Sequence, residues 1–223
     1  MSDSRSLGIE GGKSRARFVR AAPDVRRQAL IDATARCLAE KGVGGTSVRG
    51  ICARAGVSSG LLTHYFDGVD ALILATYSDV GARVSAALDA AIEAAGDDPH
   101  AQLRACLLAN FREPILDPDL LATWIAFWSL VKSDPAVAAI HAEVYGATRA
   151  QLEDRLRAAA PALTPAQTRI AAISLTALVD GLWLELCLDR SAFSPEEAQA
   201  MVEEAMNAIL QVEDGSFDQF DRH

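Results

Sequence analysis

The sequence predicts an all-α protein, and three observations lead to this fold class. Half of the 223 residues are hydrophobic, which is enough to bury a sizeable core. Apolar residues recur at helical spacing in an alanine-rich chain, whereas alternating runs of strand length are nearly absent. Thr-Pro and Ser-Pro pairs at Thr164 and Ser194 are typical of helix starts.

The first 22 residues lack periodicity and mix Gly, Ser and Arg, so we expect a flexible basic arm. A helix should follow from Pro23 to the glycines at 42 to 45, because apolar positions form one stripe along it. Thr46 is expected to cap a short second helix. Gly56 makes a tight turn, and Ser58 opens a third helix that runs to about Tyr65.

Two short capped helices joined by a tight turn form a helix-turn-helix, and we assign residues 23–68 to a three-helix DNA-binding domain. Six further helices are expected over 69–95, 99–115, 119–132, 135–160, 165–188 and 195–212. Residues 69–213 would form a larger helical domain and residues 214–223 a frayed tail.

Charge is distributed unevenly along the chain. Residues 1–66 hold 11 Lys and Arg against 5 Asp and Glu, whereas the other 157 residues hold 10 against 25. A basic N-terminal segment on an acidic remainder suggests that this segment meets a polyanion. A chance excess of solvated arginine is the alternative.

Several classes of protein lack support in the sequence. The four cysteines are scattered and the four histidines form no cluster, so we expect no metal site and a reducing compartment. The first 20 residues do not resemble a signal peptide, which favours a cytoplasmic protein. The apolar stretch 170–188 contains Asp180 and Glu185, which argue against a membrane span.

The third helix carries the clearest functional signal. Ser58, Ser59, Gly60, Thr63 and His64 should lie on its exposed face, with Tyr65 at its end. This face is small and polar and fits a DNA major groove about 12 Å wide. Arg49 on the second helix could reach the DNA backbone. A helix-turn-helix can also be a plain packing unit.

The run "TSVRGICARAGVSSGLLTHYFDGVDALILAT", with the helix before it, resembles the DNA-binding domain of TetR-family transcriptional repressors. The resemblance implies an obligate homodimer joined through the last two helices, an inducer pocket in the body, and operator release by a small molecule. It places seven residues at DNA-contact positions: Thr46, Ser58, Ser59, Gly60, Thr63, His64 and Tyr65. Where the family usually has a phosphate-binding Lys, this chain has Val69, and three basic arm residues could compensate: Arg15, Arg17 and Arg20.

The second half of the chain is similar to the choline-responsive BetI branch of that family, on "NF" at 110–111, "TWIAFW" at 123–128 and "LVDGLWLE" at 178–185. Seven residues are candidate ligand contacts: Phe111, Trp124, Phe127, Trp128, Tyr145, Asp180 and Trp183. Converging aromatic rings beside a carboxylate would suit a quaternary ammonium such as choline. Any one of these rings could instead be ordinary core, and Asp180 could be satisfied by Thr176. Glu185 stands where the choline-responsive relatives carry Arg, so the ligand or the interface charge differs.

The sequence therefore predicts a ligand-responsive repressor that binds a palindromic operator as a homodimer and needs no cofactor. The chain carries none of the GxSxG, HExxH or Gly-rich phosphate-loop motifs of common enzyme classes, so we expect no enzyme. Two alternatives remain. One is a regulator of the same fold that responds to a different apolar ligand, such as a drug or a fatty-acid derivative. The other is an adaptor without operator binding.

Overall fold

The computed structural model describes residues 23–189 and 191–211, and these residues form helices without strands, which confirms the all-α prediction. The elements are α1 (Pro23–Gly45), α2 (Val48–Ala55), α3 (Ser59–Tyr65), α4 (Gly68–Ala94), α5 (Pro99–Leu108), the 3-10 turn η1 (Ala109–Phe111), α6 (Pro118–Val131), α7 (Pro135–Ala159), α8 (Pro165–Leu188) and α9 (Pro195–Leu210).

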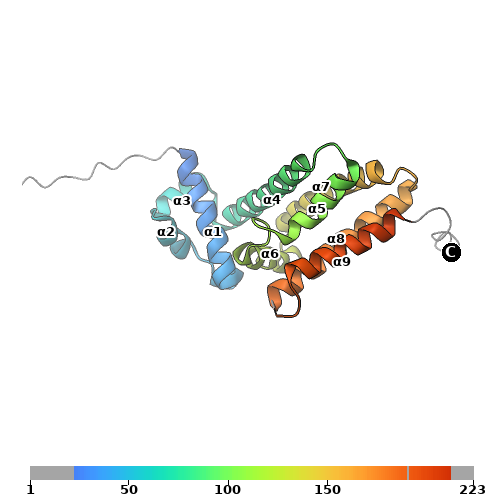
Figure 1. Ribbon diagram of the computed structural model, residues 1–223. Helices are drawn as coiled ribbons and strands as arrows, with labels where there is room; N and C mark the ends of the chain where they lie inside the picture. Colours follow the sequence, from blue (N-terminus) through green and yellow to red (C-terminus); the bar gives the residue numbers. More distant parts are fainter. Residues whose placement is uncertain (1–22, 190, 212–223) are drawn as a thin grey trace, which may run out of the picture.

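Figure 1 shows α1, α2 and α3 at one end of the molecule, which we call the head, and α4 to α9 in the remainder, which we call the body. Helix α4 runs from the head into the body, and α8 and α9 lie side by side. The basic arm expected at residues 1–22, with Arg15, Arg17 and Arg20, lies outside the described residues, as does the tail at 214–223.

The starts of the body helices follow directly from the sequence. Helices α5 to α9 each begin with a proline, preceded by a side chain that accepts backbone N–H groups. The capping residues are Asp98, Asp117, Asp134, Thr164 and Ser194. Full capping boxes stand at the last two, which confirms the helix starts expected there.

The cap expected at Thr46 is wrong by one residue, because Ser47 caps α2 and accepts a hydrogen bond from the Gly50 N–H at 3.2 Å. Thr46 still belongs to the turn that ends α1. Its hydroxyl donates to the Gly42 carbonyl at 2.8 Å, and its N–H donates to Val43. Gly42 itself leaves the helical conformation, with φ of 61°, at the expected stop.

The expectation of one helix over residues 99–115 is also wrong in its C-terminal end, because α5 ends at Leu108. Pro114 could not sit in a continuous helix, since it lacks an N–H and its ring would meet the carbonyl of Asn110. The Asn110 amide instead donates to the carbonyls of Cys106 and Leu107, at 3.1 and 3.0 Å.

Two groups of buried side chains form the core. One fills the head and includes Leu30, Ile51 and Leu62, and the other fills the body. Helix α4 serves both, because Leu72 belongs to the head core and the adjacent Ile73 to the body core. The domain boundary expected at residue 68 therefore stays a prediction, since the two cores share this helix.

Helix α8 is the described helix that is long and apolar enough to cross a membrane by length and composition alone. One face packs into the body through buried residues such as Leu175 and Val179. The other face is exposed, including Ile170 and Ile173, so that 33% of its apolar window is buried.

Candidate DNA-binding face and ligand cavity

A left-handed residue at the turn fixes the angle between α2 and α3. Gly56 has φ of 65° and ψ of 34°, and its N–H donates to the carbonyl of Cys52. Buried Ile51 and Leu62 hold the inner sides of the two helices against α1. The polar sides of both helices are left facing outward.

Five of the residues predicted to contact DNA are exposed on α3 and at its N-cap. Ser58, Ser59, Gly60, Thr63 and His64 are exposed. Ser58 caps α3 through the Leu61 N–H at 3.3 Å. The Thr63 hydroxyl donates to the Gly60 carbonyl at 3.1 Å, so it can present its methyl group and an acceptor oxygen to a partner.

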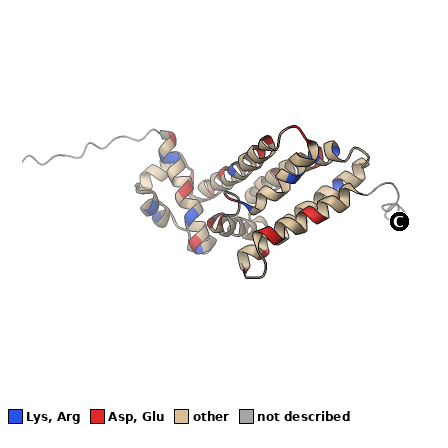
Figure 2. Ribbon diagram, viewed as in Figure 1, with Lys and Arg blue, Asp and Glu red and all other residues tan. Residues whose placement is uncertain are grey.

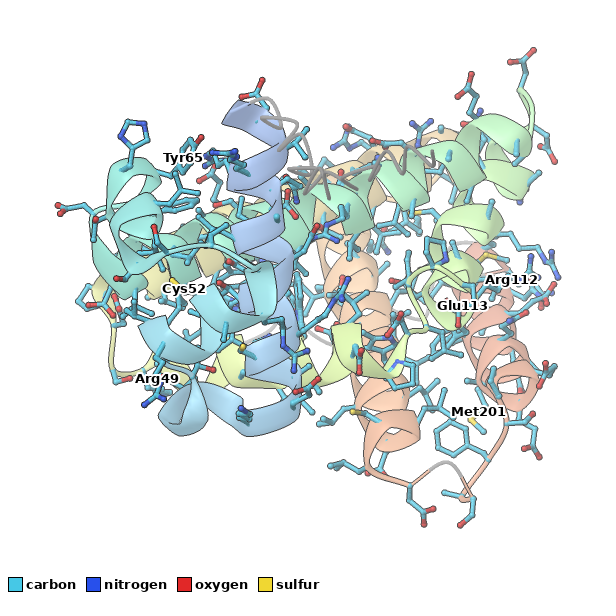
Figure 3. The ribbon with its side chains drawn as sticks, turned by 90° about the vertical axis from the view of Figure 1, so that its left-hand side faces the viewer. Arg49, Cys52, Tyr65, Arg112, Glu113 and Met201 are labelled. Carbon is cyan, nitrogen blue, oxygen red and sulfur yellow. The ribbon has the colours of Figure 1, made fainter. Side chains whose placement is uncertain are left out.

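Tyr65 and Thr46, two further predicted contacts, are half-buried. The Tyr65 ring meets the His64 ring edge-on, with centroids 5.1 Å apart. Figure 3, viewed toward the head, shows Tyr65 near one end of the head and Arg49 near the other. Arg49 is exposed, whereas Arg54 forms an ion pair with Glu40.

The folded part of the head is only weakly positive. Residues 23–68 hold six Lys and Arg against four Asp and Glu, and Figure 2 shows both signs there. Val69, where the family usually has Lys, is half-buried and packs against both cores. Phosphate attraction from residues 23–68 is therefore modest.

A cavity of ≈ 100 Å³ lies in the body between α4, α5, α6, α7 and α8. Trp124, Tyr145, Asp180 and Trp183 all line it, so four of the seven predicted ligand residues come together. The cavity is mainly apolar, and the rest of its wall comprises Gly81, Val84, Leu88, Cys106, Leu107, Asn110, Ile115, Val144, Thr148, Leu152, Thr176 and Val179.

The structure does not bring the other three predicted residues to this wall. Phe111 and Phe127 are fully buried in the body core, at 1% and 0% exposure. Phe127 stacks on Tyr77 with centroids 4.3 Å apart. Trp128 is half-buried and packs against the same core. Phe111 and Phe127 fit the alternative of ordinary core packing, whereas Trp128 forms a hydrogen bond with Tyr145 of the cavity wall.

The rings around the cavity are linked by hydrogen bonds that the sequence did not reveal. Trp124 Nε1 donates to the Tyr145 hydroxyl at 3.2 Å, and the rings of Trp124 and Trp183 meet edge-on at 6.5 Å. Behind them, the Tyr77 hydroxyl lies 2.9 Å from His141 Nδ1, and the His141 ring lies 4.4 Å from that of Tyr145. His141 is thus half-buried within this group of rings.

Asp180 is the acidic group of the cavity wall. Burial raises the pKa of its carboxyl to about 6, while a hydrogen bond from Tyr145 and the charge of Arg149 act in the opposite direction. The carboxyl is therefore mostly ionised at pH 7. Thr176 does not satisfy it as expected, because the Thr176 hydroxyl donates to the Ala172 carbonyl at 2.8 Å.

This arrangement can hold a small cation. Aromatic rings attract a cation by about 0.5–2 kcal/mol each when they are desolvated, and the ionised Asp180 supplies the counter-charge. The nearby positive charge of Arg149 limits the gain. Glu185, by contrast, is exposed on α8 and does not line the cavity.

Sequence reasoning missed the small residues of the wall. Gly81 is buried on α4, and a Cβ at this position would lie 3.1 Å from Val144 Cγ2. An isolated glycine inside a helix often marks such a close approach, so this signal was present in the sequence. The contribution of Cys106 had no comparable signal.

An exposed hydroxyl-rich third helix on a helix-turn-helix head, joined to a body with a cavity, defines a helical transcriptional regulator. Residues 30–76 match the family model of bacterial regulatory proteins of the tetR family. Residues 99–211 match the BetI-type transcriptional repressor, C-terminal. The chain belongs to the TetR family and carries a BetI-type C-terminal domain; members of this family are transcriptional regulators, not enzymes.

Similar proteins agree with this assignment. The HTH-type transcriptional regulator BetI of Burkholderia thailandensis is 35% identical over 84% of this chain and 94% of its own length. A crystal structure described as a transcriptional regulator from Pseudomonas aeruginosa is 41% identical, with a TM-score of 0.80 over 87% of this chain and 94% of its own. A regulator from Saccharomonospora viridis in complex with choline shares the fold at 16% identity, with a TM-score of 0.71 over 82% of this chain and 96% of its own.

Proposed function

We propose that this BetI-type repressor binds a palindromic operator as a homodimer in the cytoplasm and is released by a small cationic inducer, choline or another quaternary ammonium. The outward side of α3 is the observation that carries the DNA-binding part. Five exposed small or polar residues stand on it, without a bulky side chain that would keep the helix out of a major groove.

In this proposal the DNA-contacting residues form two groups with different roles. Thr63 and Tyr65 read base edges or sugars, with the Thr63 methyl suited to a thymine methyl. Arg49, Ser58 and Thr46 contact the backbone and fix the register, as do Ser59, Gly60 and His64 around them.

The cavity supports a compact cationic inducer. Three aromatic side chains (Trp124, Tyr145 and Trp183) and the Asp180 carboxylate line it together. Its volume of ≈ 100 Å³ favours a small molecule over a drug-sized ligand or a long acyl chain, which need several hundred Å³. The BetI name of the relatives and the choline held by the Saccharomonospora viridis structure point to the same ligand class.

The exposed sides of α8 and α9 support a homodimer. Ile170, Ile173 and Met201 are large hydrophobic side chains at 42%, 38% and 42% exposure, and two copies could cover them by forming a four-helix interface. Figure 3 shows Met201 on α9, at the edge of the body in that view. Covering this side would also explain why α8 is so apolar without a membrane.

Anisotropy titrations with labelled DNA from upstream of the protein's own gene test the DNA-binding part. Wild type should bind at moderate salt and prefer this DNA to a scrambled duplex. The double variant Thr63→Ala and Tyr65→Phe should lose about tenfold or more of the specific affinity. Ser133→Ala, which removes an exposed hydroxyl from the body, is the matched control and should bind as wild type does.

Equal affinity of wild type for both duplexes would contradict the proposal and favour the adaptor alternative. Retention of full specific affinity by the double variant would show that α3 does not read the operator.

A further inference from the structure

The buried polar side chains of the described residues are alike in one respect, and Thr123 on α6 differs from the rest in another. These are four threonines, Thr34, Thr76, Thr123 and Thr168, each at 2% exposure or less. Each donates its hydroxyl to the carbonyl four residues earlier in its own helix. The Thr123 oxygen additionally lies 3.0 Å from the carbonyl oxygen of Ala35, on α1 in the head.

The Thr123 hydroxyl therefore has two acceptors and a single proton. Its distance to Asp119 O within α6 is 2.7 Å, against 3.0 Å to Ala35 O. A hydroxyl has one O–H, so a bond to one carbonyl is made at the expense of the other. The Thr123 side chain is 2% exposed, whereas Ala35 is half-buried, so the hydroxyl is held between its two protein acceptors. A small shift of α6 against α1 would change which acceptor holds the proton.

The neighbouring residue joins this contact to the cavity. Trp124 follows Thr123 directly and lines the ligand cavity. Consecutive residues of α6 thus touch the cavity and the head.

We propose that Thr123 is a positioning residue that fixes the head on the body and passes a displacement of Trp124 to α1. With the hydroxyl on Ala35 O the two heads of a dimer keep the spacing that the operator requires. With the hydroxyl on Asp119 O the head is freer to move. This inference rests on the proposed function, since it needs an operator and a paired copy of the chain.

The test begins with an operator that the full-length wild-type protein selects from random-sequence DNA, so that no inducer is needed. Affinity is then measured for this operator and for a version with one extra central base pair, which moves one half-site by about 3.4 Å and rotates it. Wild type should bind the longer operator much more weakly. We call the ratio of the two affinities the spacing penalty. In Thr123→Val, which keeps the side-chain shape, this ratio should be roughly 2- to 10-fold smaller than in wild type, which is the effect of one hydrogen bond.

Two further variants separate positioning from general loosening. Thr123→Ser keeps the hydroxyl and should keep the wild-type penalty. Thr76→Val removes an equally buried hydroxyl that bonds only within α4, to Leu72 O at 2.7 Å, and should also keep it. In a second arm, added choline chloride should reduce operator affinity in wild type by a larger factor than in Thr123→Val.

An unchanged spacing penalty in Thr123→Val would overturn this inference while leaving the proposed function intact. An equal decrease of the spacing penalty in Thr76→Val would also overturn it, because the effect would then follow from the loss of any buried threonine hydroxyl. If wild type selects no operator at all, the proposed function fails, and the inference fails with it.

Discussion

The indole nitrogen of Trp124 donates a hydrogen bond to the Tyr145 hydroxyl over 3.2 Å, and both rings line the cavity of the body. Tyr145 in turn donates to Asp180, on a third helix. The bond therefore holds one ring from α6 and one from α7 beside the only acidic residue of that cavity's wall. A preformed cage of this kind loses little entropy when a ligand binds.

Replacing Asp180 by Asn should change stability and ligand affinity in opposite directions. Burial raises the pKa of Asp180 to about 6, so keeping it ionised at pH 7.5 costs free energy in the folded protein. Asp180→Asn should raise the free energy of unfolding by about 1–3 kcal/mol, since one pKa unit corresponds to about 1.4 kcal/mol. Choline affinity should fall about tenfold or more. Thermal unfolding and calorimetry measure the two effects, and Glu143→Gln, an exposed carboxylate on α7, is the control.

The pH dependence of both properties follows from the same carboxyl. Because its folded pKa is raised, its stabilising contribution is full below about pH 4 and is lost as the pH rises through about 6. Choline should bind the ionised form, so its affinity should be level from pH 7 to 8 and fall below pH 6. Burial lowers the pKa of His141, the other titratable group beside these rings, and so disfavours its charged form. A calorimetric series from pH 5 to 8 tests this, and Asp180→Asn should give a flat profile.

Two glycines provide a matched pair on facing helices. A Cβ at Gly81 would lie 3.1 Å from Val144 Cγ2, whereas a Cβ at Gly146 would meet nothing within 4 Å. Gly146→Ala should stabilise the protein by about 0.5–1 kcal/mol through helix propensity and leave choline affinity unchanged. Gly81→Ala should gain less stability and bind choline several-fold more weakly, because it narrows the cavity. Equal ligand affinities in the two variants would show that the crossing of α4 and α7 does not shape the site.

Arg49 should contact a DNA phosphate and should not contribute to sequence recognition. Arg49→Gln should weaken binding to specific and scrambled duplexes by the same factor and reduce the slope of log affinity against log salt by about 1 per subunit. Titrations at several salt concentrations measure this slope. Lys132→Gln, which removes an exposed charge from the end of α6, should leave it unchanged. A change in sequence preference instead would indicate that Arg49 contacts a base.

A charge on the exposed side of α8 should separate the dimer. Ile173 is 38% exposed, so Ile173→Asp should leave the fold of one chain intact but bury a charge in the proposed interface. We expect a monomer by sedimentation and a large loss of operator affinity. Val25→Asp, at a position 59% exposed in the head, should remain a dimer. A dimeric Ile173→Asp protein would place the interface elsewhere.

Much of the fold could be predicted from the sequence, because capping and turn signals are local. Thr164 and Ser194 mark the starts of α8 and α9, and Gly56 marks the turn before α3. One error arose where two adjacent residues could play the same role. Thr46 and Ser47 both carry a hydroxyl, and only the turn that ends α1 decides which one caps α2.

The candidate ligand site was harder to predict, since helical spacing shows which residues share a face but not which neighbour that face meets. Trp124 and Phe127 lie on one helix and both pack inward, yet only Trp124 reaches the cavity wall. His141 lies one helical turn before Tyr145, but its hydrogen-bond partner Tyr77 lies 64 positions away in the sequence. Such long-range contacts leave no local pattern.

The most direct test of the account is the mass and specificity of the protein–DNA complex, measured by analytical ultracentrifugation on the selected operator and on a scrambled duplex of equal length. The account predicts two copies of the 23.7 kDa chain on each operator duplex, weak binding to the scrambled duplex at moderate salt, and release of the operator by choline chloride. A single chain per duplex, or equal binding to both duplexes, would contradict it.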